Sequence, residues 1–212
     1  MRTTIEVAIV RAKRGVSTVS LEKAALSVQP ALPDLKGFIG RELGVSADGL
    51  WVDLIHWRSQ EEAAEAQNVV MTIPACMDYF SQVESQLDEC AMLFEQVCVQ
   101  PARVPMQAGA IEVVIAKVDA GVSMDRFVAA ALAMNPLLPH LYGFVSREFG
   151  MRADGAFIDL IYWCDVHAAE AAARVITQVP VCARFFELID SRHMQCIHFT
   201  RLRQAAEACC EI

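Results

Sequence analysis

Apolar and polar positions in the first half of the chain alternate between strand-like and helix-like patterns. The segment IEVAIV, residues 5–10, places Ile5, Val7 and Ile9 on one face and Glu6, Ala8 and Val10 on the other, which is the period of a strand. The segments that follow are interpreted in the same way: a helix over 21–28, strands over 37–43 and 50–57, a helix over 59–71, a short helix beginning at Pro74, and a strand over 90–97.

Helix-capping and turn-forming residues support these boundaries. Ser17 stands where an N-cap belongs, and Pro74 is placed to start the second of two consecutive helices. Asp48-Gly49 between the two middle strands is a strong hairpin dipeptide. The predicted order is therefore β-α-β-β-α-β, the ferredoxin-like unit.

The same pattern occurs twice. Arg41 and Trp57 recur as Arg147 and Trp163, an offset of 106 residues in both cases. At this fixed offset, and without a gap, about 34 of the 86 positions in 5–90 are identical to those of the second copy. A period this long indicates two duplicated domains rather than a solenoid, whose units are about 20–50 residues long.

The duplication predicts the domain organisation. Pro and Gly residues between the copies indicate a linker over 101–109, so the first repeat is predicted at 1–100 and the second at 110–212. A ferredoxin-like sheet with helices on one face leaves its other face in need of a partner. We therefore expect α+β architecture in which the two antiparallel sheets pack into one α+β barrel within the chain. This is an intramolecular pseudo-dimer, and a further homodimer is left open.

Composition narrows the class of protein. Of 212 residues, 55% are hydrophobic and 21% charged, which is enough apolar material for a substantial core. The net charge of −8 and the lack of a clustered basic surface argue against nucleic acid as a partner. The N-terminal segment has no signal-peptide pattern, and no apolar run is long enough to span a membrane. We expect a cytoplasmic protein whose eight cysteines are free thiols.

Three segments resemble a known superfamily. They are a strand ending in Trp (WVDLIHW and FIDLIYW), an Ala/Glu-rich helix (EEAAEA and AAEAAA), and a Pro followed by an aromatic pair (IPACMDYF and VPVCARFF). In these features the chain resembles the dimeric α+β barrel superfamily, which includes antibiotic biosynthesis monooxygenase-like proteins. The resemblance implies a small-molecule pocket. It also implies an enzyme of the cofactor-free monooxygenase type, acting on a phenolic or quinol substrate.

Charged and aromatic residues repeated on the strands are the candidate site. Asp53 and Asp159 are the candidate catalytic bases, because a desolvated carboxylate gains basicity. The expected ligand pocket, if this strand face points into the barrel, is lined by Glu6, Arg41, Trp57, Glu112, Arg147 and Trp163. The alternative interpretation is an Arg–carboxylate network that satisfies itself, and the sequence favours it, because both repeats keep the residues and an unpaired interior charge is costly.

The segment HMQCIH near the end of the second repeat contains residue types that bind metals. Cys196 and His198 share one face of the predicted strand, and His193 precedes them. The first copy has no equivalent set, and no third or fourth ligand is evident from the sequence. We therefore predict no metal and no organic cofactor.

Two other functions remain open. The first is a non-catalytic ligand-binding or stress-related accessory protein of unknown ligand, whose barrel is mostly filled by its own side chains. The second is haem binding, for which Trp57 and Trp163 are available but no Asn or His falls in register. An interior cavity large enough for an aromatic ligand would distinguish the enzyme from the accessory protein.

Overall fold

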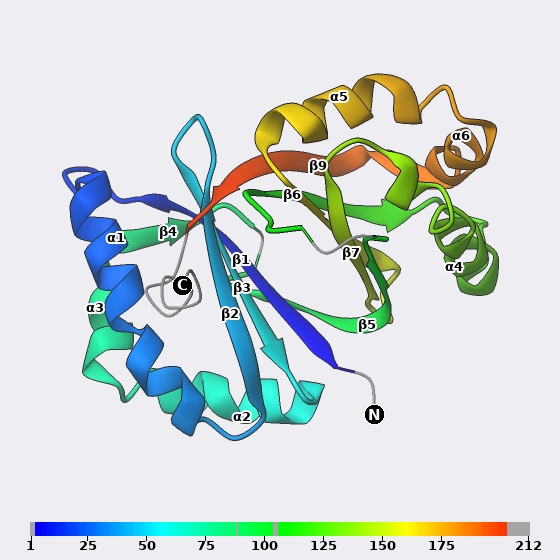
Figure 1. The fold of residues 1–212 in the computed structure, drawn as a ribbon. Coiled ribbons are helices and arrows are strands. Elements are labelled where there is room, and N and C mark those ends of the chain that lie inside the picture. The colour runs from blue at the N-terminus through cyan, green and yellow to red at the C-terminus, as the bar shows by residue number, and fades with distance from the viewer. Residues whose placement is uncertain (1–2, 88, 104–105, 203–212) are drawn as a thin grey trace. The chain divides into compact units, whose positions relative to one another are not determined.

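Two compact units make up the computed structural model, which describes residues 3–87, 89–103 and 106–202 (Figure 1). Unit 1 comprises Met1–Glu95 with Arg201–Ile212, and unit 2 comprises Gln96–Thr200. Both have the α+β order predicted from the sequence. None of the helices in the described part of the chain combines the length and the apolar character needed to cross a membrane.

Unit 1 is a ferredoxin-like unit with three helices on one face of its sheet (Figure 1). Its elements are β1 (Thr4–Ala12), α1 (Thr18–Ser27), the 3-10 helix η1 (Gln29–Asp34), β2 (Phe38–Val45), β3 (Leu50–Trp57), α2 (Gln60–Val70), α3 (Pro74–Gln82), β4 (Val83–Ser85) and the start of β5 (Met92–Pro101). Strand β1 is central: β3 pairs with one of its edges and is followed by β2, while β4 and β5 pair with the other edge.

Unit 2 repeats this arrangement. Its elements are β6 (Ala110–Val118), α4 (Met124–Ala133), the 3-10 helix η2 (Leu138–His140), β7 (Phe144–Met151), β8 (Ala156–Trp163), α5 (Val166–Ile176), α6 (Pro180–Phe186) and β9 (Ile189–Arg201). Strand β6 takes the central place between β8 and β9, and β7 pairs with β8. A single long β9 therefore replaces the separate β4 and β5 of unit 1.

The residues predicted to begin the helices have their expected effect. The Ser17 side chain accepts a hydrogen bond from the Ser20 amide and caps α1, and Ser123 caps α4 in the same way. Pro74 occupies the first turn of α3, where its missing N–H costs nothing. Local chemistry thus fixes where the helices of both repeats begin.

The boundary between the units differs from the predicted linker. Strand β5 pairs with β1 through Met92–Glu95, whereas its residues from Gln96 onward belong to unit 2. At the other end of the chain, Arg201 belongs to unit 1 although most of β9 lies in unit 2. The division therefore falls inside two strands, where no Pro or Gly marks it.

Candidate functional site

A buried ion pair links strands β2 and β3 in unit 1. The Arg41 guanidinium donates from Nε to Asp53 Oδ1 at 2.8 Å and from Nη2 to Oδ2 at 2.5 Å. Its Nη1 donates to the carbonyl of Ala25 on α1 at 2.6 Å. Arg41 is 5% exposed and Asp53 7%. The pair therefore ties the sheet to its covering helix through charge-assisted hydrogen bonds.

Unit 2 contains the same pair with one more partner. Arg147 donates from Nε and from Nη2 to the two oxygens of Asp159, at 2.7 Å each. Its Nη1 donates to the carbonyl of Ala131 at 2.7 Å and to Asn135 Oδ1 at 2.8 Å. Arg147 has no exposed surface. Both predicted bases, Asp53 and Asp159, thus accept bidentate hydrogen bonds from a guanidinium.

A second repeated pair joins a carboxylate to an indole. Trp57 Nε1 donates to Glu6 Oε2 at 2.6 Å in unit 1, and Trp163 Nε1 donates to Glu112 Oε2 at 2.9 Å in unit 2. Both indoles are 1% exposed. The hydrogen bond satisfies the polar end of a buried Trp and fixes the direction of the carboxylate.

All these side chains lie on the sheet face that the helices cover. The pairing of β1, β3 and β2 places Glu6 opposite Ile55 and Ile55 opposite Arg41, so these residues share one face. The hydrogen bond from Arg41 to Ala25 identifies this face as the one beneath α1. This face therefore points toward the helices. It does not point away from them into a barrel, contrary to the expectation from the sequence.

Unit 1 contains a pocket of about 500 Å³ between this face and its helices. Three of the predicted pocket residues, Glu6, Arg41 and Trp57, line it together with the predicted base Asp53. Apolar side chains such as Ile55 provide most of the remaining wall, so the few polar groups are placed in an apolar space of ligand size.

Two groups give the pocket its chemistry. Burial raises the pKa of Glu6 to about 7, and the hydrogen bond from Trp57 offsets part of that rise. Tyr79, from α3, is 3% exposed, and its hydroxyl is buried without a hydrogen-bond partner. Burial also raises the pKa of Tyr79, with the charge of Asp53 adding to the effect. A basic carboxylate and an unsatisfied neutral hydroxyl therefore line the same pocket.

The corresponding region of unit 2 contains a cluster of phenylalanines. Phe127, Phe149, Phe157 and Phe185 are all buried, with ring centroids of neighbouring pairs 4.9–6.5 Å apart. Phe185 stands at the position that Tyr79 has in the first repeat. The two units have therefore diverged on the helix-covered face, one toward a polar pocket and the other toward aromatic packing.

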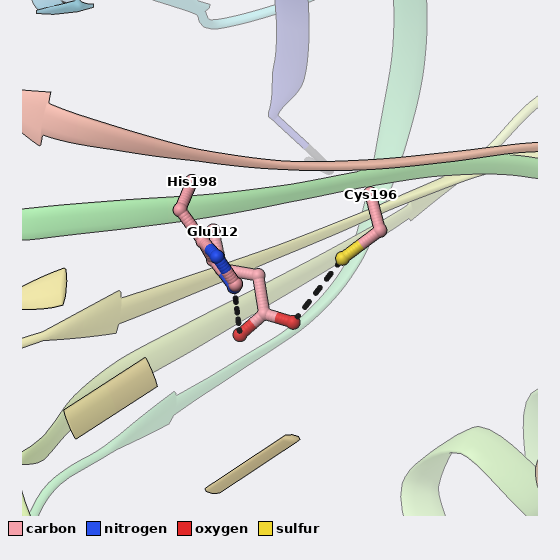
Figure 2. Close-up of side chains that lie close together, drawn as sticks. All are labelled: Glu112, Cys196 and His198. Atoms are coloured by element: carbon pink, nitrogen blue, oxygen red, sulfur yellow. Dashed lines mark hydrogen bonds and ion pairs between the residues drawn. The ribbon is translucent and has the colours of Figure 1, made fainter. Parts of the chain in front are cut away.

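Unit 2 has a different polar cluster at the pairing of β6 with β9. Figure 2 shows the carboxylate of Glu112 between the side chains of Cys196 and His198. The Cys196 thiol lies 3.7 Å from Glu112 Oε1, and His198 Nε2 lies 3.9 Å from Oε2. Desolvation and the charge of Glu112 raise the pKa of Cys196 to about 12, and Glu112 raises the pKa of His198. The side chain of His193 lies outside the described residues.

Sequence patterns alone do not single out Tyr79, and they place Glu112 in a ligand pocket rather than beside Cys196 and His198. In the sequence Tyr79 is one of an aromatic pair, and its replacement by Phe185 in the second copy is the visible difference between otherwise similar segments. Glu112 was not connected with Cys196 and His198, because the link depends on the register between strands distant in sequence.

Comparisons with known proteins give a fold. No family model matches the chain, and no curated protein matches it. Solved structures do match along its length. A proposed monooxygenase of Fusobacterium nucleatum has a TM-score of 0.68 at 9% identity, covering 95% of this chain and 93% of its own. An anthrone oxidase-like protein has a TM-score of 0.65 at 12% identity, covering 95% and 92%.

A third similar structure is a variant of chlorite dismutase from Candidatus Nitrospira defluvii. Its TM-score is 0.64 at 12% identity, and the match covers 96% of this chain and 93% of that one. These full-length matches confirm the predicted fold class, α+β with two ferredoxin-like repeats of the α+β barrel type. At such low identity the likeness concerns the fold alone. The chain shares this α+β fold with all three solved structures.

Proposed function

We propose that unit 1 binds a small aromatic ligand of the phenol or quinol class in its pocket and oxidises it with molecular oxygen. The observation that carries the proposal is Glu6, a carboxylate with a pKa near 7 in an apolar pocket of about 500 Å³. A base of that pKa is half deprotonated near neutral pH, where it can accept a proton from a weakly acidic ligand. The likeness in fold to a proposed monooxygenase and an anthrone oxidase-like protein supports this class of reaction.

The reaction begins with proton transfer to Glu6. A phenolic O–H, or an acidic C–H beside the ring, gives its proton to the Glu6 carboxylate and leaves an electron-rich anion. For an anthrone-like substrate, the ring CH₂ and one O₂ become a ring C=O and one water. The ligand is oxidised and dioxygen is reduced, so no other electron donor is needed. The Trp57 indole holds Glu6 in place, and the Tyr79 hydroxyl is available to bind the ligand oxygen.

We assign Asp53 a positioning role instead of the role of base. Both of its oxygens accept hydrogen bonds from Arg41, so neither is available to take a proton from a ligand. Asp159 has the same bidentate contact with Arg147 in unit 2. Because these contacts occupy both aspartates, they also favour a second candidate function. In it the protein binds the ligand without reacting with it.

Replacing Glu6 with Gln tests the proposal, because this substitution keeps the shape of the side chain and removes the base. We expect oxygen uptake with anthrone-like phenols and quinols to fall at least 100-fold. In the unaltered protein, kcat/KM should rise as pH increases through about 7, where Glu6 loses its proton. Glu65→Gln on the exposed surface of α2 removes one charge away from the pocket and is the matched control.

Ligand binding distinguishes the two functions. Quenching of Trp57 fluorescence by the ligand, together with oxygen uptake that depends on Glu6, supports the oxygenase. Quenching without oxygen uptake in the unaltered protein supports the non-catalytic binder. Tyr79→Phe should weaken the binding about three- to tenfold, the value of one hydrogen bond. A complete lack of quenching across the phenol and quinol panel would overturn both.

A further inference from the structure

Three side chains with metal-binding atoms converge on one face of β6 and β9. Antiparallel pairing places His198 opposite Glu112, and Cys196 lies two residues earlier on the same strand, opposite Val114. One thiol sulfur, one imidazole nitrogen and one carboxylate oxygen all lie within 4.8 Å of one another. Figure 2 shows the three side chains directed toward a common point.

We propose that Glu112, Cys196 and His198 bind a divalent transition-metal ion of the zinc class. Thiolate, imidazole and carboxylate are the three ligand types that zinc accepts, and three protein ligands leave a fourth position for water. Tetrahedral zinc with bonds of about 2.0–2.3 Å holds its ligand atoms about 3.3–3.7 Å apart. The distance from Cys196 Sγ to Glu112 Oε1 is 3.7 Å, that from His198 Nε2 to Glu112 Oε2 is 3.9 Å, and one ligand atom from each of the three residues lies within 4.8 Å of the other two. Binding through one Glu112 oxygen therefore requires closure by up to about 1.5 Å, and it displaces the thiol proton of Cys196.

The surroundings of the cluster support a ligand site. His198 Nε2 is buried without a hydrogen-bond partner, and Glu112 Oε2 lies 3.9 Å from it, a contact that is an ion pair only when the imidazole is protonated. An unsatisfied buried nitrogen is costly, and a metal ion would satisfy it. The Trp163 indole donates to Glu112 at 2.9 Å, which is the kind of outer contact that orients a metal-binding carboxylate.

Only the second repeat carries this set among the described residues. In unit 1 the residue opposite Glu6 is Leu93, whose side chain offers no ligand atom. The site is therefore independent of the unit 1 pocket, and the failure of either proposal leaves the other intact.

Titration of the full-length protein with Co²⁺ tests the site, because thiolate bound to cobalt gives a charge-transfer absorption that other ligands do not. We expect saturation at one equivalent, reversal by Zn²⁺, and loss of the band in Cys196→Ser. Cys90→Ser is the matched control, since Cys90 is the residue that the repeat aligns with Cys196, and it should leave the band unchanged. A missing band, or one that persists in Cys196→Ser, overturns the proposal.

A second set of variants separates coordination from loss of folding. His198→Gln and Glu112→Gln should each weaken Zn²⁺ binding at least 100-fold in competition with a chelator, while their far-ultraviolet circular dichroism stays that of the unaltered protein. Trp163→Phe removes the outer hydrogen bond while keeping an aromatic ring in the core, and it should weaken binding about tenfold. Equal Zn²⁺ affinity in His198→Gln and the unaltered protein would show that the ion binds elsewhere.

Discussion

The buried Arg–Asp pair is the residue-scale feature that the two repeats share most closely. Removing two charges from water costs several kcal/mol for each ion, and only good geometry with further hydrogen bonds offsets that cost. Arg147 meets this condition with hydrogen bonds to Asp159, Ala131 and Asn135. A pair of this kind contributes modestly to net stability but is costly to break.

Asp159→Leu should destabilise the protein by about 3–5 kcal/mol, because it leaves the Arg147 guanidinium buried without its counter-charge. The double variant Arg147→Met/Asp159→Leu should be less destabilised than Asp159→Leu alone, since no unpaired charge remains. Urea unfolding of both variants and of Arg147→Met completes a double-mutant cycle. A loss below about 1 kcal/mol in Asp159→Leu would contradict a structural role for the pair.

Part of the candidate site could be predicted at this scale. Alternation along the strands, seen twice, is enough to place Glu6, Arg41, Asp53 and Trp57 on one face. The sequence does not say which layer covers that face, because apolar residues occupy both sides of the strands. Only the packing of α1 on the sheet shows that the site lies beneath the helices.

At the scale of elements, a glycine turn connects the 3-10 segment of unit 2 with strand β7. Gly143 has φ +75°, a conformation that favours glycine, and it lies against the start of α5. A Cβ added there would lie 2.5 Å from Ala168 Cβ and 2.7 Å from Cys164 Sγ. The turn therefore requires glycine for its backbone conformation and also for close approach.

Gly143→Ala should be more destabilising than Gly155→Ala. Gly155 has φ +84° but no atom within 4 Å of an added Cβ, so alanine there meets only the backbone penalty of about 1–2 kcal/mol. At Gly143 the clash adds to that penalty, and we expect a total loss of about 3 kcal/mol or more. Thermal unfolding of the two variants gives the comparison, and equal melting temperatures would show that the helix moves away freely.

The register of the last strand is the element-scale feature that the sequence could not provide. At the fixed offset of 106, His198 corresponds to Met92, yet the structure pairs Glu112 with His198 and Glu6 with Leu93. The strands have slipped by one residue relative to the ungapped repeat. The pairing of β6 with β9 also shifts register between Ile115 and Lys117. Such irregularities depend on cross-strand pairing, which no local pattern encodes.

At the scale of the whole molecule, unit 1 combines segments from distant parts of the sequence, whereas unit 2 is one continuous stretch, Gln96–Thr200. The repeat itself predicted two ferredoxin-like units, because identities at one offset report duplication directly. Pro and Gly residues, however, indicate turns and not the limits of a compact unit. They therefore predicted a boundary at 101–109. Contacts divide the chain at Glu95 and again at Arg201, inside strands β5 and β9. Arg201 and Leu202 are therefore part of the unit that the first 95 residues build.

Residues 201–202 should consequently stabilise unit 1. The Leu202 amide donates to the carbonyl of Leu43 at 2.8 Å, and Arg201 Nε donates to Glu42 Oε2 at 2.7 Å. A chain ending at Thr200 lacks one backbone hydrogen bond and one partly exposed ion pair that a chain ending at Leu202 retains. We expect the shorter chain to lose about 1–2 kcal/mol.

The comparison of these two truncated chains isolates residues 201 and 202, because both lack everything beyond them. Urea unfolding followed by the fluorescence of Trp51 and Trp57, in a Trp163→Phe background, reports unit 1 specifically, since the chain has three tryptophans. A lower midpoint for the chain ending at Thr200 is the expected result. Identical midpoints would mean that unit 1 is complete without the C-terminal strand end, and that the predicted boundary near residue 100 describes a self-sufficient domain.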